Sequence, residues 1–119
     1  MSAPWPLEIR LKRTPSSLDV LFEGGERVLL DAEYLRVESP SAEVKGHGGQ
    51  APPPVAGKRT VRITAVEPVG NYAVRLIFDE GHSTGLYSWA LLHELGLERE
   101  ARWSAYLTRL QEFGLSREA

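Results

Sequence analysis

The three histidines are the side chains in this sequence most able to do chemistry. His82 follows Asp79 closely, so an imidazole and a carboxylate could meet for acid–base or metal chemistry. His47 lies in a glycine-rich stretch, and His93 fits the boundary of a helix face. No His-x-Asp or His-x-Glu pair occurs, so the sequence spells out no iron site of two histidines and one carboxylate. An iron or zinc site formed by His82, His47 and a carboxylate such as Asp79 or Glu43 is one hypothesis.

Nucleophilic catalysis is disfavoured by the remaining residues. Ser39 and Ser41 flank Pro40 without a Gly-x-Ser-x-Gly elbow or an adjacent histidine, so turn formation is the simpler interpretation. The chain has no cysteine, which excludes disulfides and thiolate metal sites formed by this chain alone. Residues 46–49 are glycine-rich but lack the Lys-Ser/Thr of a phosphate loop. No catalytic set is assembled, and the sequence favours a protein that is not an enzyme.

Binding of a small ligand is a further hypothesis. An aromatic-lined pocket between sheet and helix could surround a cationic ligand. Core packing of the same rings is the simpler alternative. The residues that would form the pocket are Tyr72, Tyr87, Trp89 and Arg36.

The elements that must position these side chains are predicted to be mostly strands, followed by helices. Apolar and polar residues alternate in several short segments, which is typical of half-buried strands. Gly24-Gly25 and Glu80-Gly81 are predicted turns, since glycine takes up positive φ without steric cost. Asp31 is placed to begin a short helical turn that runs to Leu35. The predicted strands are residues 7–13, 18–23, 27–30, 60–66, 74–78 and 82–87.

Two helices are predicted to close the chain. Ser88 is a suitable N-cap for the first helix, and Gly96 is predicted to end it as a C-terminal cap. The second helix covers residues 97–115, with Gly114 at its end. Its apolar stripe suits packing on the sheet, or contact with a second copy or a partner. The stripe consists of Trp103, Tyr106, Leu107, Leu110 and Phe113.

The fold class predicted from these elements is α+β. We expect an antiparallel or mixed β-sheet built from hairpins, with the C-terminal helices packed on one face as a two-layer sandwich. The 119 residues are expected to form a single domain, 1–119, with a flexible Gly/Pro loop at 45–58.

Charge and hydropathy exclude several functional classes. The net charge of −2 is spread over interspersed acidic and basic residues, which gives no basic field for nucleic acid. The basic cluster Arg10, Lys12 and Arg13 alternates with apolar residues, as on the solvated face of a strand. No apolar run is long enough for a membrane span, and no signal-peptide pattern is present. We therefore expect a cytoplasmic protein that binds neither nucleic acid nor membrane.

Several short motifs, in order, resemble a known family. The motifs are Tyr34-Leu35-Arg36, Ser39-Pro40-Ser41-Ala42-Glu43-Val44, Gly46-His47-Gly48, Val69-Gly70-Asn71-Tyr72-Ala73 and the run from Asp79 to Trp89. Over about residues 6–95 the chain resembles the gamma-butyrobetaine hydroxylase-like N-terminal domain, DUF971, in its standalone bacterial form. This domain has no assigned activity of its own. The candidate binding surface comprises Arg36, Ser39, Ser41, Glu43, Tyr72, Asp79, Tyr87 and Trp89.

The resemblance also bears on zinc. In the hydroxylase-type members, three cysteines and one histidine hold a zinc ion, and the matching positions here read Ser39, Ser41, Val44 and His82. A lone imidazole does not hold zinc in a tetrahedral structural site. We therefore predict no cofactor, with local hydrogen bonds of the two serines and packing of Val44 in place of the metal. Iron or zinc at His82 and His47 remains the alternative.

What the resemblance implies about function is an accessory role. Hydroxylation belongs to a separate catalytic domain that these residues do not include, and related domains accompany Mrp-type P-loop ATPases that carry iron–sulfur clusters. The leading hypothesis is a small non-catalytic binding module that assists iron–sulfur or metal-protein maturation. Its expected partner is a protein, either an iron–sulfur assembly ATPase or a second copy of the chain. The metal site and the aromatic ligand pocket are the two alternatives.

Overall fold

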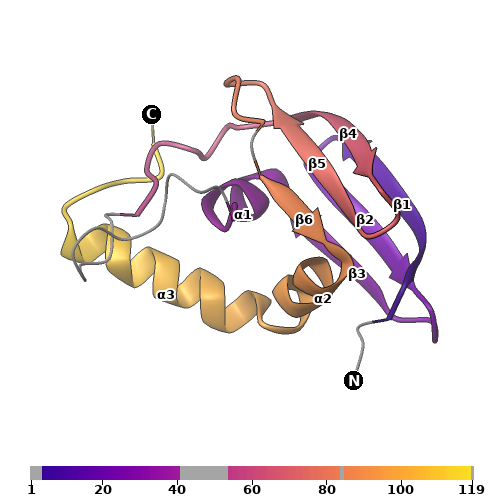
Figure 1. Cartoon of the computed structure of the whole chain (residues 1–119). Coiled ribbons are helices and arrows are strands. Elements are labelled where there is room, and N and C mark those ends of the chain that lie inside the picture. Colours follow the sequence, from indigo (N-terminus) through magenta and orange to yellow (C-terminus); the bar gives the residue numbers. More distant parts are fainter. Residues whose placement is uncertain (1–3, 41–53, 84, 119) are drawn as a thin grey trace, which may run out of the picture.

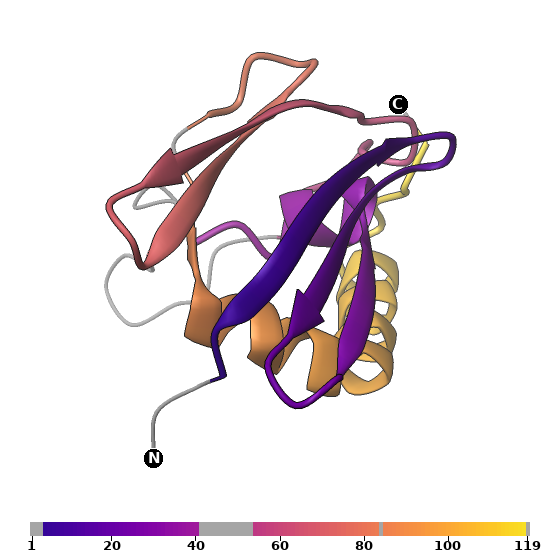
Figure 2. The same ribbon diagram turned by 90° about the vertical axis from the view of Figure 1, so that its right-hand side faces the viewer.

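The computed structural model describes residues 4–40, 54–83 and 85–118. Its strands form two antiparallel three-stranded sheets, ordered β1-β2-β3 and β4-β5-β6 (Figures 1 and 2). This confirms the predicted α+β class built from hairpins with C-terminal helices, although the strands divide between two sheets. The strands are β1 (Pro6–Arg13), β2 (Ser16–Phe22), β3 (Arg27–Asp31), β4 (Ile63–Val69), β5 (Ala73–Phe78) and β6 (Leu86–Ser88). The helices are α1 (Ala32–Val37), α2 (Trp89–Leu97) and α3 (Arg99–Glu112).

The inner faces of the two sheets form most of the core. Strand alternation directs Leu18, Val20 and Phe22 of β2 inward, and all three are fully buried. From the other sheet, Leu76 and Phe78 of β5 join the same cluster. The half-buried strand predicted for residues 74–78 is therefore confirmed, and α1 and α2 close the ends of this core (Figure 2).

Glycine turns connect the hairpins as the sequence predicts. Gly24 and Gly25 have φ of 89° and 96° between β2 and β3, and Gly81 has φ of 92° in the turn after β5. These values lie in the left-handed region, which glycine enters without a steric penalty. Strand β6 begins at Leu86, later than the strand predicted for residues 82–87.

The strand predicted for residues 60–66 is displaced to β4 (Ile63–Val69). The pairing of β4 with β5 shifts register between Ile63 and Ala65, as at a β-bulge. The bulge changes which residues face inward, so Ile63 and Val66 belong to the core side. The plain alternation seen in the sequence could not anticipate this change of phase.

Helix α2 begins as predicted but does not end as predicted. The Ser88 side chain accepts a hydrogen bond from the Leu91 amide at 3.1 Å, which confirms the N-cap. Gly96 lies inside α2, which ends at Leu97 with Glu98 as its C-cap, so the prediction of a glycine cap was wrong. A Cβ at Gly96 would lie 2.5 Å from Cγ1 of Val28 in β3. Glycine at this position lets α2 pack closely on the first sheet.

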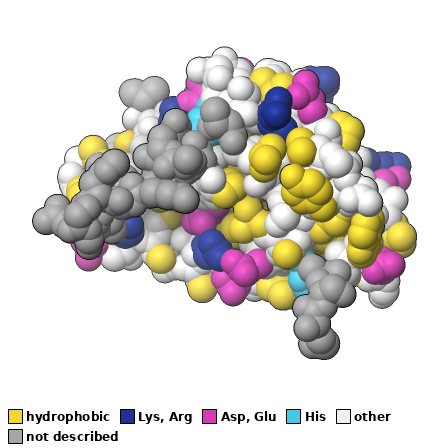
Figure 3. Space-filling view, in the orientation of Figure 1, with side chains coloured by type: hydrophobic (Ala, Val, Ile, Leu, Met, Phe, Trp, Pro, Cys, Tyr) yellow, Lys and Arg dark blue, Asp and Glu magenta, His cyan; other side chains and the backbone are white. Residues whose placement is uncertain are grey.

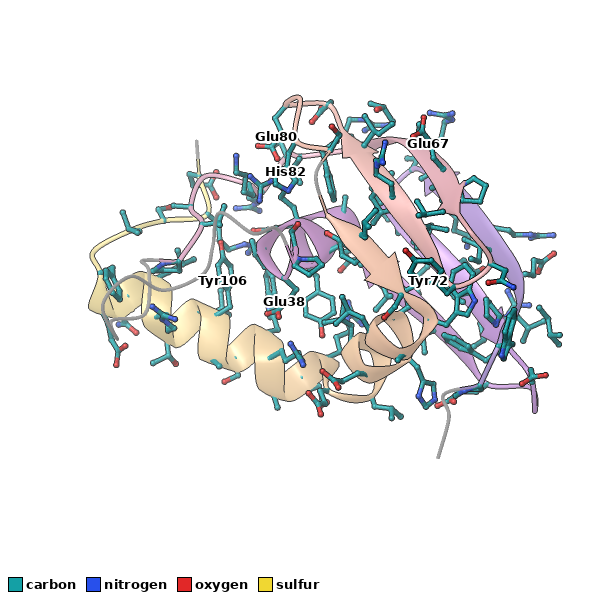
Figure 4. The ribbon with its side chains drawn as sticks, in the orientation of Figure 1. Glu38, Glu67, Tyr72, Glu80, His82 and Tyr106 are labelled. Atoms are coloured by element: carbon teal, nitrogen blue, oxygen red, sulfur yellow. The ribbon has the colours of Figure 1, made fainter. Side chains whose placement is uncertain are left out.

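Helix α3 extends away from the sheets beneath α1 (Figure 1). Tyr106 and Leu110 are buried, whereas Leu107 and Phe113 of the predicted stripe are exposed. The Tyr106 hydroxyl donates a hydrogen bond to the Val55 carbonyl at 2.6 Å, so this side of α3 contacts the segment before β4 (Figure 4). Within residues 4–40, 54–83 and 85–118, no helix has the length and hydrophobicity that a membrane span requires.

Candidate functional site

The candidate site is a corner where the end of α1 meets the turn between β5 and β6. Ser39 follows α1, and His82 lies in the turn (Figure 4). The Ser39 Oγ and His82 Nε2 atoms are 3.0 Å apart, which is hydrogen-bond distance. The structure thus brings together two of the positions that the resemblance aligns with metal ligands.

Gly85 makes this close approach sterically feasible. A Cβ at Gly85 would lie 2.4 Å from the Ser39 Oγ and 3.3 Å from a ring carbon of Tyr87. A side chain at this position would therefore displace the Ser39 hydroxyl from its place beside His82 or move β6 away from the end of α1. Gly85, which belongs to the motif from Asp79 to Trp89, therefore allows the backbone to pack closely at the corner.

Tyr87 ties β6 to α1 beneath the corner. Its side chain is fully buried, and its hydroxyl donates a hydrogen bond to the Leu35 carbonyl at 2.5 Å. Burial raises the pKa of the Tyr87 phenol above its usual range, so the hydroxyl keeps its proton and continues to donate. Tyr87 is therefore a core residue in this structure.

The charged residues of the corner are paired with each other. The Glu80 carboxylate accepts hydrogen bonds from both Arg36 and Lys58. Partial burial acts to raise the pKa of Glu80, but the hydrogen bonds from Lys58 and Arg36 outweigh it and hold the pKa below its ordinary value. The Asp79 carboxylate accepts from the Arg62 amide at 3.2 Å and so closes the neighbouring turn.

The residues predicted for an aromatic pocket lie in different surroundings. Arg36 lies beside the β5–β6 turn, whereas Tyr72 lies in the β4–β5 turn at the opposite end of β5 (Figure 4). Trp89 donates its backbone amide to the Tyr72 carbonyl at 3.1 Å and its indole N–H to the Asn71 carbonyl at 2.9 Å. With Tyr87 inside the core, the structure does not bring these four side chains to one pocket.

The predicted metal ligands are only partly described. Ser41, Glu43 and His47 lie outside the described residues. In the described part of the chain, no three His, Asp or Glu side chains are grouped closely enough to hold a metal ion. His93 contacts Glu26, with 2.7 Å between Nε2 and Oε1, and its ring packs against Phe22. A metal site that includes His47 therefore remains a prediction.

A second candidate site, which the sequence did not reveal, is an apolar groove between β1 and β4. These strands are edge strands of different sheets, and no backbone hydrogen bond joins them among the described residues. Pro68 in β4 is consistent with an edge position, because proline cannot donate to a ladder. The groove has a volume of about 420 Å³. It is lined by Ile9, Leu11, Val66, Pro68, Val74 and Trp89.

Cationic side chains lie at the end of the groove where the sheets are joined. Arg62 donates to the Arg13 carbonyl at 2.8 Å, and the Ile63 amide donates to the Ser16 hydroxyl at 2.9 Å. No carboxylate of the described residues forms an ion pair with Lys12, Arg13 or Arg62. This end of the groove therefore carries cationic side chains without a direct carboxylate partner among the described residues, while the Asp79 carboxylate lies against the Arg62 backbone amide.

Further hydrophobic side chains gather over the outer surface of the second sheet. Figure 3 shows this concentration over β5 and β6. Leu86 of β6 and Tyr72 in the β4–β5 turn are both exposed. Trp89 connects the two regions, since it lines the groove and is bonded to the turn that holds Tyr72.

Fold and site together define a small two-sheet α+β domain whose corner holds a serine–histidine pair. The family model described as gamma-butyrobetaine hydroxylase-like, N-terminal, matches residues 9–93, and the chain belongs to this family. No match is found among curated proteins.

Solved structures agree with this assignment. Two proteins with solution NMR structures are 45% and 39% identical to this chain, with TM-scores of 0.83 and 0.84. Each covers 98% of this chain, which in turn covers 86% and 92% of theirs. A crystal structure from Acidithiobacillus ferrooxidans ATCC 23270 is 39% identical, with a TM-score of 0.67 over 80% of this chain and 98% of that chain. That protein has unknown function and belongs to the DUF971 family.

Proposed function

We propose that the chain is a non-catalytic cytoplasmic binding module that docks on a protein partner through the β1–β4 groove. The observation that carries the proposal is an apolar groove between two unpaired edge strands, with positive charge at one end. The occupant we propose is an extended apolar segment of the partner with carboxylates at one end.

The corner is better suited to holding the fold together than to chemistry. Ser39 is buried and bonded to His82, and Glu80 is held by two cations. A general base or nucleophile needs a free atom that can reach a substrate. The polar groups of the corner instead link α1 to the β5–β6 turn, in the place where the resemblance puts zinc in other members.

The shape of the groove favours an extended segment. Edge strands present unpaired backbone groups, and a peptide can add to such an edge as a further strand. The alternating side chains of the added strand would then face the groove, where Leu11 and Val66 supply apolar contacts from opposite sheets. A helix would leave the edge groups of β1 unpaired.

The positive charge at one end of the groove determines the direction in which the occupant binds. Lys12, Arg13 and Arg62 would attract carboxylates, and an exposed pair of this kind contributes up to about 1 kcal/mol. Three such contacts would raise affinity and fix the direction of the segment. Because these cations are exposed, added salt should weaken the contribution.

The test is binding of a designed peptide. The probe is a hexapeptide of alternating valine and threonine that is followed by two aspartates, and binding is followed by NMR shifts of the β1 and β4 amides. We expect this peptide to bind about tenfold more tightly than the same peptide ending in two lysines, which corresponds to about 1.4 kcal/mol.

The double variant Lys12→Glu/Arg13→Glu should reverse this preference for the peptide that ends in aspartates. Arg10→Glu is the matched control, because Arg10 lies on the same strand but contacts Glu8 at 3.4 Å. Equal binding of both peptides, or shifts confined to other strands, would refute the proposal.

The finer proposal is that the partner takes part in iron–sulfur or metal-protein maturation. It is supported by the resemblance to domains that accompany iron–sulfur assembly ATPases. The direct test is whether such an ATPase from the native host binds the purified chain and loses affinity for the Lys12→Glu/Arg13→Glu variant. Binding that the variant leaves unchanged would place the contact elsewhere.

The alternative function is metal binding by His82 with His47. The observation that favours it is the 3.0 Å approach of Ser39 to His82 at the metal position of other members. Elemental analysis of tag-free protein purified without oxygen and without chelator would decide it. Near-stoichiometric iron or zinc that is lost in His82→Ala would establish the site, and metal-free folded protein would remove it.

A further inference from the structure

Glu33 and Trp103 hold the guanidinium group of Arg117 from two sides. The Arg117 Nε and Nη2 atoms donate to the two carboxylate oxygens of Glu33 at 2.8 and 2.7 Å. The guanidinium carbon lies 5.3 Å from the centre of the Trp103 ring. Glu33 itself is only 7% exposed. A buried carboxylate and an aromatic face are the two features that recognise a guanidinium group.

The segment that carries Arg117 is held by this side chain, by an ion pair between Arg59 and Glu118, and by backbone hydrogen bonds. Among residues 111–118, Arg117 is partly buried and the other residues are exposed. Two backbone hydrogen bonds tie the segment to the chain before β4, from Gly57 to the Ser116 carbonyl and from Arg59 to the Arg117 carbonyl. Phe113 and Leu115, the apolar residues of the segment, are exposed. Little hydrophobic burial therefore opposes release of the segment.

The site has room beside Arg117. A cavity of about 420 Å³ adjoins the guanidinium group, and Asp31, Glu100 and Ser104 line it with additional oxygen atoms. Arg99 is held on the rim by Asp31 at 2.9 Å. A guest larger than one guanidinium group would find further acceptors here, so the cavity suits an arginine that is part of a peptide.

We infer that Glu33 and Trp103 form a binding site for an arginine side chain of another protein, and that Arg117 is its exchangeable internal ligand. An arginine from outside would make the same bidentate contact with Glu33 and the same contact with the Trp103 ring. Lysine offers a point charge without the planar fork and would satisfy only part of the site. The site lies on α1 and α3 and is distinct from the β1–β4 groove, so the two proposals stand independently.

The test removes the internal ligand and supplies an external one. The probe is N-acetyl-arginine amide, and its binding to Arg117→Ala is followed by the fluorescence of Trp103, with Trp5 and Trp89 replaced by phenylalanine. We expect binding about tenfold tighter than to the parent protein that retains Arg117. N-acetyl-citrulline amide, which is neutral and nearly isosteric, should not bind. Adding Glu33→Gln to Arg117→Ala should abolish binding of the arginine probe.

A second measurement covers the case in which Arg117→Ala does not fold. The Arg117 Nε–Hε resonance of the unmodified protein is followed by NMR while the arginine probe is added at millimolar concentration. Exchange of Arg117 predicts that this resonance moves toward its solvent-exposed position with arginine and stays in place with the citrulline probe. A resonance that does not respond to arginine, or folded Arg117→Ala that binds both probes alike, would overturn the inference. Results with the Lys12→Glu/Arg13→Glu variant should match those of the parent protein.

Discussion

Replacement of Gly96 by alanine tests how closely α2 packs on the first sheet. In an unobstructed helix, glycine to alanine stabilises by about 1 kcal/mol. Here the new Cβ would lie 2.5 Å from Cγ1 and 3.0 Å from Cβ of Val28, closer than carbon atoms approach without displacement. Overpacking of this kind costs about 1–3 kcal/mol, so we expect a net loss of about 1 kcal/mol.

The second variant that completes this test is Val28→Ala. Removing the two methyl groups of Val28 relieves the 2.5 Å contact with Cγ1 and leaves the 3.0 Å contact with Cβ, so the double variant should recover most of the clash energy. The coupling between the two substitutions should favour the double variant by at least about 1 kcal/mol. Val28→Ala alone is the control for the methyl groups lost from the packed surface.

The assay is equilibrium denaturation with urea, supported by thermal unfolding. A loss of about 1 kcal/mol should lower the midpoint temperature by about 4 °C in a domain of this size. Stabilisation by Gly96→Ala, or additive effects of the two substitutions, would show that α2 does not approach Val28 as described.

Three other predictions concern the tyrosines and the corner. Burial raises the pKa of Tyr34 and Tyr106 to about 12 and also raises the pKa of Tyr87. Above about pH 10 only the unfolded chain ionises at these tyrosines, so the free energy of unfolding should fall as pH rises. Denaturation between pH 9 and 11 measures this loss. Glu80→Gln should cost at most about 1 kcal/mol at neutral pH. Because the pKa of Glu80 is lowered in the folded state, its contribution should disappear as pH falls through that pKa, and a stability curve that is flat in acid would contradict this. Ser39→Ala should cost about 1 kcal/mol and show coupling with His82→Ala in a double-mutant cycle, whereas additivity would exclude the hydrogen bond.

Local signals in the sequence were sufficient where one residue determines the geometry. Ser88 predicted the start of α2, and Gly24-Gly25 and Gly81 predicted turns that require positive φ. Gly96 looked like a cap because it falls at the end of an apolar helical pattern. Its real role depends on Val28, a residue distant in sequence, and no local pattern reports such a contact.

Features that depend on how the sheets meet could not be predicted. The bulge in β4 changes which side chains face inward, and only pairing with β5 reveals it. The groove requires β1 and β4 to be edges of separate sheets, whereas the sequence suggested a single sheet. Likewise, the contact of Arg117 with Glu33 joins residues 84 positions apart, and neither had a signal of its own. Pro68 was the one residue that could have indicated an edge strand.

Occupation of the β1–β4 groove by a partner protein can be tested by site-specific photo-crosslinking in the native host. A photoreactive phenylalanine derivative is placed at Leu11 in the groove and, as the control, at Gln111 on the exposed face of α3. We predict a discrete cross-linked protein from position 11 that is absent from position 111 and is lost when Lys12→Glu/Arg13→Glu is added. The same products from both positions, or no product from the groove, would show that no partner docks there.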